Sequence, residues 1–119
     1  MPPRVRVTIY DRDVHEVRED VKAEGLRDLP VEERNVWVDV TGLGDKALLE
    51  ALIGIFDLPW LAMEDVLQSP QRPKVDIYAD HTLVITRMVQ LTDAGELRTE
   101  QLAILFGPTF VLTVQEEPE

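Results

Sequence analysis

The chain contains no cysteine, and this absence excludes several kinds of chemistry. Neither a disulfide framework nor a thiolate metal site nor a thiol nucleophile can be built without it. Long hydrophobic runs are also missing, since the longest, such as residues 102–106, have the length of a strand. A membrane-spanning helix needs about 18 consecutive apolar residues, and residues 1–4 lack the apolar core of a signal peptide. We therefore expect that these 119 residues do not themselves enter a membrane.

Positive charge is scarce. The chain has 12 Lys and Arg residues against 23 Asp and Glu residues, and its net charge is -11. Nucleic acid is an unsuitable partner, because neutralising phosphates requires clustered Lys and Arg. A bare anionic lipid surface is disfavoured for the same reason. Cations and basic proteins fit as partners, although many acidic domains are simply kept soluble by their charge.

Residues suited to catalysis are also few. His15 and His81 are the two histidines, and neither has a second histidine one helical turn away, as a zinc site requires. Gly42 and Gly44 lack the third glycine of a dinucleotide-binding loop and the Lys-Ser/Thr of a P-loop. The acids of residues 11–16 lack the glycine of a calcium loop and indicate a turn. Because no general base, nucleophile or metal cluster can be assembled, we expect a protein that is not an enzyme.

Apolar and polar residues alternate along several short segments, which is the pattern of β-strands. In one of them, Val36, Val38 and Val40 share a face, while Trp37 and Asp39 share the other. Strands are predicted over residues 4–9, 14–17, 36–40, 75–79, 82–91, 97–105 and 110–114.

Two helices are predicted between the third and fourth of these strands. The first covers residues 45–56, with apolar residues at helical spacing and Asp45 as a candidate N-cap. The second covers residues 59–67, with proline at its first position. Its predicted buried stripe consists of Trp60, Met63 and Leu67.

Together these elements predict one α/β (α+β) domain over residues 1–119. A mixed β-sheet would carry two short helices between strands and end in a C-terminal antiparallel meander, because the last loops are too short for crossovers. The two helices can cover one face of the sheet, so the other face is expected to need a cover from outside this chain. Residues 18–35 are charged, and we expect a mobile connector with one helical turn after Leu29.

The segment from Glu64 to Val75 combines an acidic pair with a sharp corner. Pro70 and Pro73 must end the helix and start extended chain, because proline disfavours helical geometry before it. Adjacent acids on a short helix are commonly just its solvated side, and they point about 100° apart. Magnesium takes one or two carboxylates and keeps several waters. Glu64 and Asp65 would therefore form a weak magnesium site only with carboxylates from a facing subunit.

Four segments resemble, in order, the cytoplasmic N-terminal domain of CorA-type magnesium/cobalt transporters. They are residues 36–43, with a tryptophan, an aspartate and a Thr-Gly turn; 48–56, a helix; 58–75, with Glu64-Asp65 and Gln-Arg-Pro-Lys; and 100–116, a hairpin ending in Phe-Val-Leu. The resemblance covers about two thirds of the chain. It implies a sandwich fold on the cytoplasmic side of the cell membrane, followed in the family by a long helix and two membrane helices that assemble as a homopentamer around a pore.

The resemblance also implies a role. The residue matching Asp65 is a magnesium-sensing ligand completed by an acid on the neighbouring subunit's long helix, and the residue matching Glu64 lies near a second regulatory ion site. The long helix, the membrane helices and the partner acid lie outside these 119 residues. What is implied is a regulatory, magnesium-sensing domain of a transporter for magnesium and also cobalt, whose partners are divalent cations and neighbouring subunits.

Two alternatives stay open. The first is the same domain of a zinc-transporting relative, for which the absence of cysteine and the scarcity of histidine give no support. The second is a free-standing acidic domain that binds other proteins. Its sequence support is an acidic surface and a sheet left uncovered on one side.

Overall fold

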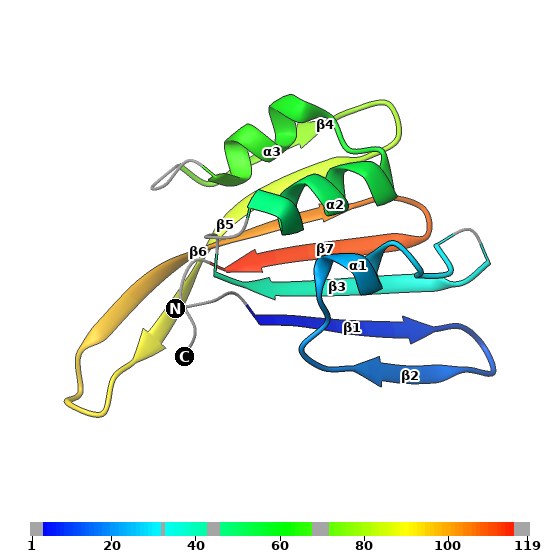
Figure 1. Ribbon diagram of the computed structural model, residues 1–119. Helices are drawn as coiled ribbons and strands as arrows, with labels where there is room; N and C mark the ends of the chain where they lie inside the picture. Colours follow the sequence, from blue (N-terminus) through cyan, green and yellow to red (C-terminus); the bar gives the residue numbers. More distant parts are fainter. Residues whose placement is uncertain (1–3, 32, 43–45, 68–71, 116–119) are drawn as a thin grey trace.

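A computed structural model describes residues 4–31, 33–42, 46–67 and 72–115 of the chain. Seven strands form one mixed sheet in the order β2-β1-β3-β7-β6-β5-β4 (Figure 1). The strands are β1 (Arg4–Tyr10), β2 (His15–Arg18), β3 (Asn35–Thr41), β4 (Lys74–Ile77), β5 (Thr82–Leu91), β6 (Leu97–Phe106) and β7 (Phe110–Gln115). The predicted mixed sheet is confirmed, and the predicted strand positions match to within one or two residues at most ends.

The pairing directions follow from the connections. β5, β6 and β7 form the predicted antiparallel meander, because the loops between them are short. β3 pairs with β7 in parallel, from Val36 opposite Phe110 to Thr41 opposite Gln115. This parallel pair joins the N-terminal strands to the meander, so residues about 75 positions apart in the sequence become neighbours.

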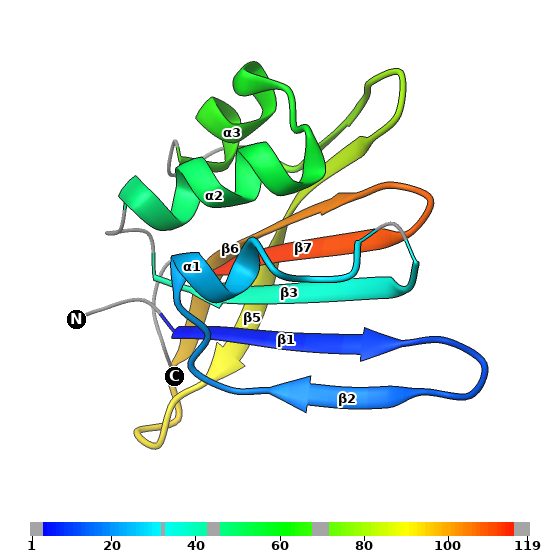
Figure 2. The ribbon, with the colours of Figure 1, turned by 45° about the vertical axis from the view of Figure 1, so that its right-hand side comes forward.

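Three helices lie on one side of the sheet: α1 (Ala23–Leu26), α2 (Lys46–Phe56) and α3 (Trp60–Leu67) (Figure 2). The core lies between them and the sheet, because alternate strand residues turn their apolar side chains toward the helices. Val7, Val38 and Leu112 are fully buried there, as is Leu52 of α2. Phe56, the last residue of α2, stacks on Phe110 with ring centroids 4.4 Å apart.

The expectation of a mobile connector over residues 18–35 was wrong for the residues described. One helical turn, α1, lies before Leu29, and a second turn follows Leu29 as predicted, because the N–H group of Arg34 donates to the Pro30 carbonyl at 3.0 Å. Leu26 is fully buried, Leu29 is 7% exposed, and the Val21 N–H donates to the Val5 carbonyl at 3.0 Å. The few leucines of this charged segment keep it ordered against the domain, because Leu26 and Leu29 pack into the core beside α2.

The opposite face of the sheet is covered by none of the elements described. It carries Trp37 on β3 and Phe106 on β6, with 42% and 40% of their surfaces exposed. Val75 and Ile77 of β4 are on the same face, opposite Val84 and Thr82 of β5. The predicted strand is therefore confirmed, but its alternating apolar residues face outward and it ends at Ile77 rather than Ala79.

Candidate functional site

Helix α3 holds the acidic pair that the sequence singles out. The Pro59 carbonyl accepts hydrogen bonds from the N–H groups of Ala62 and Met63, at 3.1 and 3.3 Å, so proline stands just before the first helical turn. Ala62, Met63 and Val66 are buried. This buried side fixes the rotation of α3 on the rest of the domain, because residues three and four apart share a face.

Glu64 is exposed, as expected for the side of α3 away from the core. Asp65 belongs to α3, but its side chain lies outside the described residues, as do those of Trp60 and Leu67. Of the predicted buried stripe, Met63 is confirmed. Residues 43–45 and 68–71, which include the predicted N-cap and most of the proline corner, are likewise outside what the structure describes.

Asp76 and His81, near β4 and β5, have structural partners. Asp76 pairs with Lys74 across 3.0 Å within β4. The Nε2 atom of His81 lies 3.2 Å from the Phe56 carbonyl, and the imidazole packs against Phe110. Within the described part of the chain, no group of three or more histidine, aspartate or glutamate side chains is placed to hold a metal ion.

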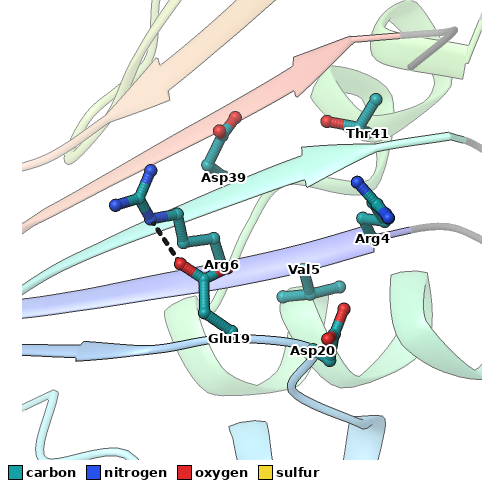
Figure 3. Close-up of a pocket in the computed structure, with 7 residues that line it drawn as sticks. All are labelled: Arg4, Val5, Arg6, Glu19, Asp20, Asp39 and Thr41. Atoms are coloured by element: carbon teal, nitrogen blue, oxygen red, sulfur yellow. Dashed lines mark ion pairs between the residues drawn. The ribbon is translucent and has the colours of Figure 1, made fainter. Parts of the chain in front are cut away.

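A pocket that sequence reasoning did not predict opens beside β1 and β3, with a volume of about 370 Å³ (Figure 3). Arg6 and Glu19 form an ion pair across it, 3.0 Å apart, and Asp20 has a positive φ of 51°. Its charges of both signs nearly cancel, so it has no strong preference for an anion or a cation. The lining residues are Arg4, Val5, Arg6, Glu19, Asp20, Asp39 and Thr41.

Asp39 also ends a hydrogen-bond chain on the uncovered face of the sheet. The Trp37 indole N–H donates to the Thr113 hydroxyl at 3.0 Å, and that hydroxyl donates to the Asp39 carboxylate at 2.8 Å. Because β3 and β7 are parallel neighbours, Thr113 lies directly opposite Asp39. The sequence offered one indication of these hydrogen bonds, because alternation along the strand predicted that Trp37 and Asp39 share a face.

Asp11 closes the turn between β1 and β2. Its Oδ1 atom accepts hydrogen bonds from the N–H groups of Asp13 and Val14, at 2.8 and 2.9 Å, and Arg34 pairs with its other oxygen. The Asp13 N–H bond is the largest cause that lowers the pKa of Asp11 below its ordinary value of 3.8, with further lowering from Val14 and Arg34. The acids at this position therefore form a turn, as the sequence indicates.

None of the helices among the described residues combines the length and the hydrophobicity that crossing a membrane requires.

Comparison with known proteins identifies the family. Residues 32–119 match the family described as CorA-like Mg2+ transporter protein. The cobalt/magnesium transport protein CorA of Thermotoga maritima is 24% identical over 114 residues, which cover 93% of this chain and 32% of that protein.

Solved structures share the fold. Full-length CmaX has a TM-score of 0.72 at 20% identity, with 98% of this chain and 36% of CmaX covered. The cytoplasmic domain of ZntB from Vibrio parahaemolyticus has a TM-score of 0.70 at 12% identity, with 100% of this chain and 46% of that chain covered. The chain thus spans about a third of the length of CorA and CmaX. Since the family match covers β3, all the helices after it and the whole meander, the chain belongs to the CorA-like Mg2+ transporter family.

Proposed function

We propose that this chain is the cytoplasmic, magnesium-sensing domain of a CorA-like divalent cation transporter that carries magnesium and also cobalt. The observation that carries the proposal is the position of the acidic pair. Glu64 and Asp65 lie on α3, inside the region matched to the family, and α3 turns its other side into the core. The exposed Glu64 is accessible to an ion or to a facing subunit.

The donor chemistry of this pair fits magnesium. Carboxylate oxygens are the ligands that magnesium prefers, and the ion keeps several of its waters. Adjacent helical residues point about 100° apart, so one copy of α3 offers a given ion one carboxylate. Asp65 would hold the ion, with Glu64 near it, and a facing subunit of a homopentamer would supply the remaining acid. The isolated chain would therefore bind magnesium weakly.

The mechanism follows from electrostatics. Each copy carries a net charge of -11, so facing acidic surfaces repel one another. Magnesium bound between subunits neutralises this repulsion and stabilises the closed ring, and loss of magnesium loosens the ring and opens the pore. The ion shifts this equilibrium only by the difference between its affinities for the closed and open arrangements.

The test is magnesium-dependent protease protection of the pentameric transporter that the proposal requires, in EDTA and in millimolar magnesium. Asp65→Ala should weaken the protection, and Glu64→Ala should weaken it less. Glu50→Ala is the matched control, because Glu50 is an exposed acid of α2 in the same helical layer. Unchanged protection in Asp65→Ala would show that Asp65 is not a sensing ligand. The same titration with cobalt and zinc compares the three ions at one site.

A further inference from the structure

One large apolar side chain is exposed on the helical layer of the domain. Leu61 of α3 has 67% of its surface exposed, and every other exposed large apolar side chain among the described residues lies on a strand. A single exposed leucine is common on protein surfaces and by itself indicates no partner. The position of Leu61 on α3, relative to the core and to the acidic pair, is what distinguishes it.

Leu61 lies on the side of α3 that faces away from the core. The buried residues of this helix are Ala62, Met63 and Val66. At 3.6 residues per turn, Leu61 lies about 150° around the helix from the centre of that buried group. Glu64 and Asp65 follow Leu61 by three and four residues, so their positions share its side of the helix, one turn further along. Any surface that approaches the acidic pair therefore also meets Leu61.

The proposed magnesium site requires a facing subunit close to this side of α3. Magnesium binds oxygen ligands at about 2.1 Å, so acids of two subunits that share one ion, directly or through its waters, must lie close together. One helical turn advances about 5.4 Å along the axis, which is the separation between Leu61 and the acidic pair. Leu61 therefore lies inside the contact area that a shared ion would create.

We propose that Leu61 packs against the facing subunit and supplies an attraction beside the magnesium site that needs no metal ion. This inference rests on the proposed function, which provides the facing subunit. Each copy carries a net charge of -11, so approach at the acidic pair is opposed by repulsion. Burial of an apolar side chain favours the closed arrangement with or without the ion. Leu61 thereby lowers the magnesium concentration at which the ring closes, because the ion has less repulsion left to offset.

Magnesium titrations of protease protection in the pentameric transporter measure this attraction. Leu61→Ala should raise the magnesium concentration at half-maximal protection by about three- to tenfold, whereas Leu61→Met, which stays apolar at similar volume, should change it by less than about twofold. Leu91→Ala is the matched control, because it makes the same chemical change at a leucine of β5 that is 72% exposed. Melting curves of the 119-residue chain verify that Leu61→Ala leaves the domain itself folded. An unchanged midpoint in Leu61→Ala, or an equal rise in Leu91→Ala, would overturn the proposal.

Photo-cross-linking tests the contact separately from the sensing role. The photoreactive residue p-benzoylphenylalanine, introduced in place of Leu61 in the transporter, should link neighbouring subunits in millimolar magnesium, as seen on denaturing gels. If Asp65→Ala loses protection but no cross-link forms from this position, the proposed contact is wrong and the sensing role stands. If cross-links form while Asp65→Ala keeps full protection, the contact stands and Asp65 is not the sensing ligand.

Discussion

Two glycines provide a matched test of how tightly the β6–β7 turn packs against the end of α2. A Cβ atom added at Gly107 would lie 2.6 Å from Cε1 of Phe110 and 3.0 Å from the backbone oxygen of Asp80. The Phe110 ring cannot easily move away, because it stacks on Phe56 at 4.4 Å. Overpacking of this kind costs about 1–3 kcal/mol. We therefore expect Gly107→Ala to lower the melting temperature by roughly 4–12 °C.

Gly54→Ala is the control, because it makes the same chemical change in α2 where the added Cβ would meet nothing within 4 Å. Replacing a glycine inside a helix by alanine stabilises by about 0.5–1 kcal/mol, so the melting temperature should rise by roughly 2–4 °C. Differential scanning calorimetry of both variants measures the two shifts. A neutral or stabilising Gly107→Ala would refute the reasoning, because it would show that the turn has room for a methyl group.

Three further outcomes follow from contacts in the structure. Asp11 has a lowered pKa, so its contribution to stability is present above its ordinary pKa of 3.8 and is lost as the pH falls through its lower folded value. In denaturant titrations at a series of acidic pH values, the free energy of unfolding of Asp11→Ala should therefore fall less steeply with decreasing pH than that of the wild type. Thr113→Val removes the hydroxyl that donates to Asp39, which should cost about 1 kcal/mol in urea unfolding, and Thr113→Ser should restore most of it. Leu52→Ala should lower the free energy of unfolding by about 2–5 kcal/mol, because Leu52 is fully buried. Leu61→Ala should change it by no more than about 0.5 kcal/mol, because Leu61 is exposed. Similar changes for the two variants would contradict the assignment of Leu52 to the core.

Much of the fold could be predicted from alternation along the chain. The predicted strand over residues 82–91 coincides with β5. Its β-branched residues favour a strand, and the polar loop that follows marks where it ends. The segment around α1 could not be predicted in the same way. A helix of one turn has little stability of its own, and its position depends on where Leu26 meets the core.

The candidate site was predicted in part. The sequence indicated that Glu64 and Asp65 lie on a short helix, and α3 contains both. The sequence also placed Met63 inward and Glu64 outward, whereas the burial of Ala62 and Val66 beside Met63 became clear only from packing. The pocket beside β1 was not predicted, because Arg6 and Asp39 become neighbours only when β1 pairs with β3.

The sequence by itself determined the absence of thiol chemistry, the strongly acidic surface and the alternation that makes this chain a sheet protein with helices between strands. These properties depend on residue types and on spacings of a few residues. The tertiary structure alone decided that β3 lies beside β7, that Val75 and Ile77 face outward, and that the β5–β6 hairpin projects beyond β4 and β7. Alternation shows that a strand has two faces, but pairing between distant segments determines which face is covered and where the sheet ends.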